Sequence, residues 1–275
     1  MQGYIHFNGE LITADEKLVG ARNRGLRYGD GVFETIRVEQ GKIPLISYHL
    51  ERLIHGLHTL HFELPDHLSL QYITAAMLEL GRKNDMEQQA RVRLNLFRGN
   101  GTDLNIIIES EPLAGNYSSF NENGFVVDIY KDVKKSCDIL SNLKSNNYLP
   151  YAMAAFHAKA NGLNDCLVMN SYDRICDSTI ANIFWIKDKQ LFTPPLSEGC
   201  VAGVMRRYLG EKMLDAGYAL EEMICTRQKL LEADEVFLTN ALFGIRWVQQ
   251  LRDSTYSNKL SAQLYKQFVK PLFTF

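Results

Sequence analysis

The stretch Leu143-Lys144-Ser145-Asn146-Asn147-Tyr148 stands where a predicted strand ends near Lys144 and a predicted helix, residues 148–160, begins. Regular elements on both sides of such a junction hold its side chains in one place. An amine acts as a nucleophile only when it is partly neutral. Because the reference pKa of lysine is about 10.4, this requires burial or a cationic neighbour. Lys144 is therefore a candidate nucleophile, to be judged by the rest of the chain.

The chain after this junction alternates short strand-like runs with turns. A helix is expected between the loop that starts at Thr193-Pro194-Pro195 and a stop at Gly217, and a shorter helix before residue 235. One strand is expected shortly before the junction, at 125–130. The strands expected after it are 167–169, 175–177, 183–186, 219–224, 235–239 and 246–248.

The chain before the junction shows the same mixture. Residues 4–7 and 10–12 flank Asn8-Gly9, which predicts a β-hairpin. Ser47 is the expected N-cap of a helix, because leucine and isoleucine follow it at helical spacing. The remaining expected elements are a strand at 32–39, a helix from 70 to about 81, a strand at 91–98 and its partner at 104–108.

Residues 111–124, Glu-Pro-Leu-Ala-Gly-Asn-Tyr-Ser-Ser-Phe-Asn-Glu-Asn-Gly, are rich in turn formers and lack apolar periodicity. This composition predicts a linker between two domains. We expect an N-terminal α/β domain at 1–113, a linker at 114–123 and a C-terminal domain at 124–275. Strands and helices alternate in both parts, so the fold class is α/β (α+β).

The composition excludes several classes of protein. The 275 residues are 46% apolar and carry a net charge of −2, which argues against a nucleic-acid binder or a polybasic membrane anchor. No apolar run approaches the ~20 residues of a membrane span, and no signal peptide is recognisable, so we expect a cytoplasmic protein. Five scattered cysteines without a CxxC pair, and histidines without an HExxH arrangement, predict no metal site.

Seven segments, taken in order, resemble the class IV aminotransferase family of pyridoxal-phosphate enzymes, fold type IV. The resemblance covers roughly residues 7–248. It implies a smaller N-terminal α/β domain, a larger C-terminal pseudo-barrel domain, a homodimer, bound pyridoxal 5'-phosphate and a small-molecule substrate. The segments are Gly29-Asp30-Gly31-Val32-Phe33-Glu34-Thr35-Ile36-Arg37, His49-Leu50-Glu51-Arg52-Leu53, Lys144 to Tyr148, Asn182-Ile183-Phe184, Thr193-Pro194-Pro195-Leu196, Gly203-Val204-Met205-Arg206 and Ala233-Asp234-Glu235-Val236-Phe237-Leu238-Thr239-Asn240-Ala241-Leu242.

The same resemblance assigns cofactor-binding roles. Lys144 matches the Schiff-base lysine, which also moves protons, and Arg52 matches the arginine that grips the cofactor phosphate. Val204 and Met205 begin a helix, so their N–H groups can face that phosphate. Tyr148 matches the tyrosine that hydrogen-bonds the phenolic oxygen of the cofactor.

Asp177 departs from the family pattern, which places a glutamate opposite the pyridine nitrogen. A carboxylate is retained, but it is one methylene shorter. The charge that keeps the ring protonated is therefore present, and a water bridge or a shifted strand would have to make up for the shorter reach.

Within the family, two positions resemble aminodeoxychorismate lyase, which converts 4-amino-4-deoxychorismate to 4-aminobenzoate and pyruvate in folate synthesis. Thr35 occupies a place that is glycine in typical branched-chain enzymes, and its hydroxyl could relay a proton. Asn240 matches an asparagine that helps to hold a substrate carboxylate. The alternative is an aminotransferase for branched-chain or D-amino acids.

Two arginines on one predicted strand keep that alternative open. Arg93 coincides with a carboxylate-binding arginine of branched-chain relatives, and Arg98 with one of D-amino acid relatives. They lie on opposite faces of the strand, so both cannot serve one pocket.

Overall fold

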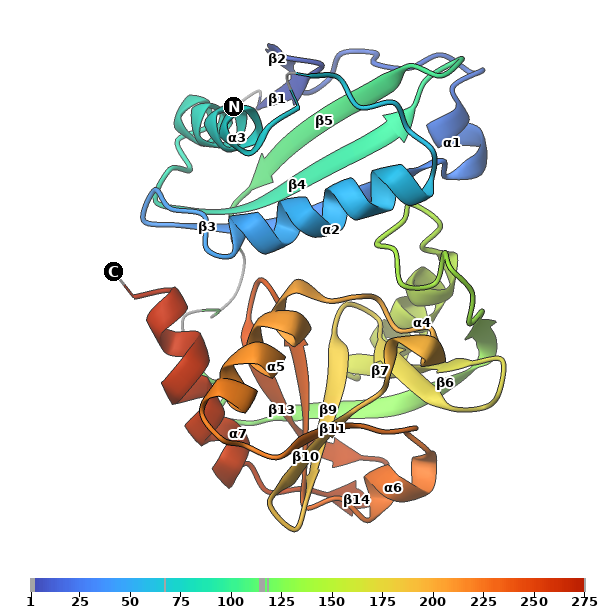
Figure 1. The fold of residues 1–275 in the computed structure, drawn as a ribbon, viewed down its shortest axis with the longest axis vertical. Coiled ribbons are helices and arrows are strands. Elements are labelled where there is room, and N and C mark those ends of the chain that lie inside the picture. The colour runs from blue at the N-terminus through green and yellow to red at the C-terminus, as the bar shows by residue number, and fades with distance from the viewer. Residues whose placement is uncertain (1–2, 67, 114–116, 118, 275) are drawn as a thin grey trace. The chain divides into compact units, whose positions relative to one another are not determined.

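The computed structural model describes residues 3–66, 68–113, 117 and 119–274 (Figure 1). The chain forms two compact units, unit 1 with Met1–Gly115 and Leu143–Asn147, and unit 2 with Asn116–Asn142 and Tyr148–Phe275. Part of the expected linker, residues 114–116 and 118, lies outside the described residues. The short segment that carries Lys144 thus groups with unit 1, whereas its sequence neighbours on both sides belong to unit 2.

Unit 1 is an antiparallel sheet of five strands in the order β2-β1-β5-β4-β3. The expected hairpin and the three longer strands are confirmed. Its strands are β1 (Tyr4–Phe7), β2 (Glu10–Thr13), β3 (Gly31–Glu39), β4 (Gln89–Arg98) and β5 (Leu104–Glu111), and its helices are α1 (Arg24–Tyr28), α2 (Ile46–Thr59) and α3 (Leu70–Lys83).

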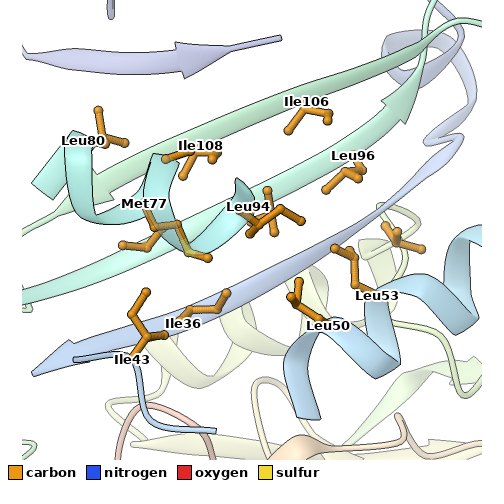
Figure 2. Packing of buried hydrophobic residues seen from close by; sticks show 14 of the residues in the cluster. Ile36, Ile43, Leu50, Leu53, Met77, Leu80, Leu94, Leu96, Ile106 and Ile108 are labelled. Carbon is orange, nitrogen blue, oxygen red and sulfur yellow. The ribbon is translucent and has the colours of Figure 1, made fainter. Parts of the chain in front are cut away.

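One face of this sheet and the apolar sides of α2 and α3 form the core of unit 1 (Figure 2). Alternate residues of β4, among them Leu94 and Leu96, are fully buried there, as a period of two requires. Leu53 of α2 and Met77 of α3 cover them. The opposite face of the sheet carries the intervening residues, most of which are polar.

Two local expectations for unit 1 are wrong. Helix α2 begins at Ile46 rather than after Ser47, because Leu45 adopts a left-handed conformation and its carbonyl accepts the first helical hydrogen bond, from the N–H of His49. No strand leads up to Lys144, because β6 ends at Lys135 and the chain then turns.

The Lys144 segment instead pairs with the edge of β3. The N–H of Phe33 donates to the Lys144 carbonyl at 2.9 Å, and the N–H of Asn146 donates to the Gly31 carbonyl at 2.9 Å. Ser145 and Val32 form an antiparallel bridge between them. These main-chain bonds fix the Lys144 backbone without a strand preceding it.

Unit 2 contains a nine-stranded sheet with the path β11-β10-β9-β12-β13-β6-β7-β8 and β14 paired to β13. Strand β8 also pairs with β9, so β9, β12, β13, β6, β7 and β8 close into a ring. The strands are β6 (Phe125–Lys135), β7 (Asp165–Asn170), β8 (Ile175–Ser178), β9 (Asn182–Lys187), β10 (Gln190–Thr193), β11 (Leu220–Glu222), β12 (Glu235–Asn240), β13 (Gly244–Leu251) and β14 (Ser254–Thr255).

A single residue pair, Asp177 with Asn182, closes this ring. A closed sheet has no unpaired edge at that point, which holds both residues firmly. Most residues of β7, β9, β12 and β13 are buried, and every residue of β8 is buried. The expected Asp177 strand is therefore confirmed, and its neighbour across the sheet comes from the segment Asn182-Ile183-Phe184.

Helices surround the ring of unit 2 (Figure 1). Tyr148 is the N-cap residue of α4, which has a proline in its first turn. The helix ends just before Gly162, and this glycine adopts a left-handed conformation. The helices are α4 (Leu149–Ala160), α5 (Val204–Asp215), α6 (Arg227–Leu231) and α7 (Lys259–Leu264), with single turns at Leu196–Glu198, Tyr265–Val269 and Lys270–Leu272. None of the helices in the described ranges has the length and apolar character that a membrane span requires.

Candidate active site

The polar face of the unit 1 sheet carries the first group of candidate residues. The Nζ of Lys144 lies 4.6 Å from the centroid of the Phe33 ring, and the Cζ of Arg93 lies 4.0 Å from the same centroid. The two cations therefore share one aromatic ring, whose electron-rich faces attract both. This places Arg93 on the Lys144 side of the sheet.

Thr35 belongs to the same face. It follows Phe33 by two positions on β3, and its Cα partner across the strands is Arg93. Its side chain is half-buried. The hydroxyl thus stands on the surface that also presents the Lys144 amine.

Arg98 lies on the opposite face, as the alternation of β4 requires. Its Nε donates to Asp30 Oδ2 at 3.1 Å, its terminal nitrogen donates to the Leu60 carbonyl at 2.6 Å, and it stacks on the Phe62 ring. The structure therefore brings Arg93, and not Arg98, to the face of Lys144.

Arg52 belongs to a buried cluster between α2 and β3. Two of its nitrogens donate to the Glu34 carboxylate, at 2.8 Å to Oε1 and 2.5 Å to Oε2. His49, one helical turn before Arg52, places its Nδ1 2.7 Å from Glu34 Oε2. The bidentate contact fixes the plane of the guanidinium.

Glu34 is ionised by this arrangement. Burial alone would raise its pKa, but the charges and hydrogen bonds of Arg52 and His49 prevail and lower that pKa from 4.5 to about 2. Burial lowers the pKa of His49, against the opposing effect of Glu34. The His49 Nε2 atom has no hydrogen-bond partner among the described residues. Glu34 and His49 lay within the quoted segments, yet their spacing gave no sign of this cluster.

Asp177 is the centre of the second group, in unit 2. Its Oδ1 accepts from the Asn182 amide at 2.8 Å. Its Oδ2 accepts from the Tyr151 hydroxyl at 2.7 Å, the Val201 N–H at 2.9 Å and the Lys135 ammonium at 3.2 Å. The residue is 2% exposed, so its carboxylate is held by protein groups rather than by solvent.

The N-terminus of α5 touches this network through Asn182. Gly203 is the N-cap of α5, and in the described part of the chain no side-chain cap bonds to the first turn, to which Val204 and Met205 belong. A Cβ atom built on Gly203 would stand 1.7 Å from Asn182 Oδ1. The absence of a side chain at Gly203 therefore lets the helix start against Asn182.

Thr239 adds a buried hydroxyl beside this helix start. It is the register partner of Asn182 across β12 and β9, and β12 packs against α5. The Thr239 Oγ1 atom is buried and has no hydrogen-bond partner within the part of the chain that the structure describes. Because a buried hydroxyl is normally paired, this atom indicates a missing acceptor or donor. The sequence did not single out Thr239, which it placed at the end of the expected strand 235–239.

Tyr148 and Asn240 are placed by hydrogen bonds within unit 2. The Tyr148 hydroxyl donates to the Thr179 carbonyl at 2.7 Å, and its ring stacks on that of Tyr151 at 4.5 Å. The Asn240 Oδ1 accepts from the N–H groups of Leu242 and Phe243, so this residue shapes the turn after β12. Its amide contacts the Ile180 carbonyl at 3.3 Å.

Lys135 and Tyr151 are two further residues that sequence reasoning did not single out. Lys135 precedes Asp177 by 42 positions, and Tyr151 is spaced as an ordinary apolar residue of α4. Only the closed sheet brings them to one carboxylate. Among the described residues, no group of three or more His, Cys, Asp or Glu side chains is arranged to hold a metal ion.

Comparison with known proteins places these features in a family. The sequence model of amino-transferase class IV matches residues 31–251. An aminodeoxychorismate lyase of Vibrio harveyi is 28% identical over 254 residues, 89% of this chain and 90% of that protein. The crystal structure of the Escherichia coli branched-chain amino acid aminotransferase superposes with a TM-score of 0.87 at 24% identity, covering 100% of this chain and 95% of that one.

A second solved structure is the branched-chain aminotransferase of the thermophilic archaeon Thermoproteus uzoniensis with norvaline. It gives a TM-score of 0.89 at 22% identity over 99% of this chain and 95% of that one. The expected fold, type IV with a barrel-like second part, is confirmed by these similarities.

Proposed function

Since the chain belongs to the amino-transferase class IV family, we propose that it binds pyridoxal 5'-phosphate and cleaves 4-amino-4-deoxychorismate to 4-aminobenzoate and pyruvate. The observation that carries the cofactor proposal is the uncapped start of α5, closed against Asn182 and accompanied by the unpartnered Thr239 hydroxyl among the described residues. The side chains of Lys144, Arg52 and Asp177 are of the chemical types that such a cofactor requires.

The phosphate would be bound by the first turn of α5. The N–H groups of Val204 and Met205 belong to a turn that no side chain caps, and such a turn attracts an anion. The Thr239 hydroxyl could donate to a phosphate oxygen, which would satisfy a buried group. Arg52 of unit 1 would supply positive charge from a guanidinium already oriented by Glu34.

The ring would be bound by Asp177 and Tyr148. When bound, pyridoxal phosphate supplies an electron sink that stabilises negative charge at the carbon bearing the substrate nitrogen. Asp177 is a buried carboxylate able to pair with a ring N–H. Tyr148 would have to redirect the proton that its hydroxyl donates to Thr179 in order to donate to the phenolic oxygen.

Lys144 and Thr35 would move protons. The Lys144 Nζ would attach the cofactor and take the proton from the carbon that carries the amino group. The Thr35 hydroxyl, on the same sheet face, would pass a proton to the departing enolpyruvyl oxygen. Formation of the aromatic ring of 4-aminobenzoate drives that elimination.

The lyase reaction is favoured by Thr35 and Asn240 together with the similarity to the Vibrio harveyi lyase. Asn240 would offer its amide to a substrate carboxylate in exchange for the 3.3 Å contact with Ile180. A branched-chain or D-amino acid aminotransferase is the second candidate. It is favoured by Arg93, whose position near Lys144 suits a carboxylate of an ordinary amino acid.

Two measurements test these proposals. Borohydride reduction of the protein with pyridoxal phosphate, followed by peptide mass spectrometry, should leave a pyridoxyl group on Lys144, while Lys144→Ala should bind the cofactor without covalent attachment. Lys17→Ala, which removes an exposed lysine of unit 1, is the matched control. A label on another lysine would refute the assignment.

The reaction is then tested with two sets of substrates. With 4-amino-4-deoxychorismate the products should be 4-aminobenzoate and pyruvate. With leucine or D-alanine plus 2-oxoglutarate, glutamate should form slowly or not at all. Glutamate without 4-aminobenzoate would reject the lyase in favour of the aminotransferase.

We also propose that the protein is a homodimer. Three apolar side chains, Leu149, Met153 and Phe156, form an exposed row along α4 at 70%, 40% and 67% exposure. Their spacing puts them on one side of the helix, where a second copy would cover them. Light scattering should give twice the 31.4 kDa chain mass, and Phe156→Lys should shift the protein toward the monomer. A wild-type mass of one chain would contradict the dimer.

A further inference from the structure

Lys135 is a buried cation that the proposed function leaves without a role. Its side chain is 8% exposed at the end of β6. Its ammonium lies 3.2 Å from Asp177 Oδ2 and donates to the Gly199 carbonyl at 2.5 Å and to the Tyr151 hydroxyl. Buried lysines are rare without a specific partner, and here the partner is the carboxylate expected opposite the pyridine nitrogen.

The two oxygens of Asp177 are used unequally. Three donors converge on Oδ2, from Lys135, Tyr151 and the Val201 N–H, whereas among the described residues Oδ1 accepts from Asn182. A carboxylate has about four acceptor sites, two on each oxygen. The capacity that remains for a ligand is therefore on Oδ1.

Among the hydrogen-bond donors that Asp177 meets in the described part of the chain, Lys135 alone brings a positive charge. Burial and the Asp177 charge raise the pKa of Tyr151, so its phenol stays protonated and donates as a neutral group. The Val201 N–H and the Asn182 amide are neutral as well. Removing the ammonium would leave a buried carboxylate without a counter-charge, which is costly.

We propose that Lys135 is a positioning residue, whose ammonium holds Oδ2 of Asp177 and so reserves Oδ1 for the ring N–H of pyridoxal phosphate. This inference rests on the proposed function. It fixes the orientation of this shorter carboxylate, because an aspartate has fewer rotatable bonds than a glutamate and is held here from one side. Lys135 acts through Asp177 and does not contact the cofactor.

A double-mutant cycle on cofactor binding tests this role. The dissociation constant for pyridoxal phosphate is measured by equilibrium dialysis for the wild type, Lys135→Met, Asp177→Asn and the double variant. Each single substitution should weaken binding about tenfold, and the double variant should bind within about twofold of Asp177→Asn. Binding by Lys135→Met at wild-type strength, or losses that multiply in the double variant, would overturn the proposal.

Two further variants distinguish an effect of Lys135 on Asp177 from a general loss of protein stability. Lys134→Met removes the neighbouring lysine, which pairs with Asp173 at the surface, and should bind as the wild type does. Lys135→Gln keeps hydrogen-bonding capacity without the charge and should lose as much affinity as Lys135→Met. It also serves if Lys135→Met does not fold, and wild-type affinity in Lys135→Gln would overturn the proposal.

The outcome also distinguishes this inference from the proposed function. If the wild type takes up no pyridoxal phosphate, the proposed function fails. If the wild type binds it at Lys144 and the Lys135 variants bind equally well, only the role of Lys135 fails.

Discussion

Replacing Glu34 by glutamine should destabilise unit 1 by removing the charge that Arg52 and His49 surround. Glu34 is fully buried, and both of its oxygens accept hydrogen bonds from these residues. Glutamine has the same shape but no charge, so the Arg52 guanidinium would lose its counter-ion.

The size of the effect follows from the pKa of Glu34. A pKa lowered from 4.5 to about 2 corresponds to roughly 3 kcal/mol of stability, since one pH unit is about 1.4 kcal/mol. Because the pKa of the folded state is the lower one, this stability is present above pH 4.5. It is lost as the pH falls toward about 2, where the folded state also takes up the proton.

Urea unfolding followed by circular dichroism measures this prediction between pH 7 and pH 2. The wild type should exceed Glu34→Gln by about 3 kcal/mol at pH 7, and the difference should shrink below pH 4.5. Glu109→Gln, at an exposed site on β5, is the matched control and should change little. A difference under about 1 kcal/mol at pH 7, or one that stays constant down to pH 2, would refute the reasoning.

Three other substitutions test the remaining site residues. Thr239→Val should leave the apoprotein as stable as the wild type but weaken pyridoxal phosphate binding by about 1–3 kcal/mol. Thr193→Val, the control, removes a buried hydroxyl that is already paired and should lower the melting temperature. The reverse pattern would contradict the role of Thr239 in phosphate binding. Gly203→Ala should displace Asn182 and cost about 1–3 kcal/mol in unfolding. Gly210→Ala, where an added Cβ would make only an ordinary van der Waals contact with Leu220, should carry no such cost, and equal melting temperatures of the two variants would reject the close approach at Gly203. Thr35→Gly should slow the elimination more than it slows half-transamination, whereas Thr35→Ser, which keeps the hydroxyl, should retain the rates of both reactions. Equal losses of rate in the two reactions of Thr35→Gly would reject the proton-relay role of Thr35.

Local sequence patterns were sufficient for most of the longer strands and helices, but not for the short elements α1, β10 and α7. The Asn8-Gly9 turn and the alternation along β4 are properties of neighbouring residues, and both predictions are confirmed. The start of α2 was missed because it depends on the left-handed backbone of Leu45, which no serine-based cap signal reveals. The strand expected before Lys144 was wrong because that segment finds its partner more than a hundred residues away, at the edge of β3.

The candidate site shows the same difference between what local sequence reveals and what long-range pairing decides. Lys144 and Asp177 could be chosen from motifs because their chemistry is visible in the residue type. The residue that holds Asp177 could not be chosen from the sequence. Lys135 contacts Asp177 only because the sheet of unit 2 closes through the pair Asp177 and Asn182. Likewise, whether Arg93 or Arg98 faces Lys144 depends on which side of β4 packs against the helices.

Among the acids that are already paired with a base before any ligand is considered, one in each unit belongs to the candidate site. Glu34 orients Arg52, and Lys135 orients Asp177. Because both pairs are buried, their charges are solvated by the protein itself and need little rearrangement when an ion arrives. The Thr239 hydroxyl and the first turn of α5, which no described side chain satisfies, carry no charge. A phosphate at the first turn of α5 would thus be met by fixed dipoles, and one at Arg52 by an oriented guanidinium. In either case groups that are already ordered lower the entropic cost of binding.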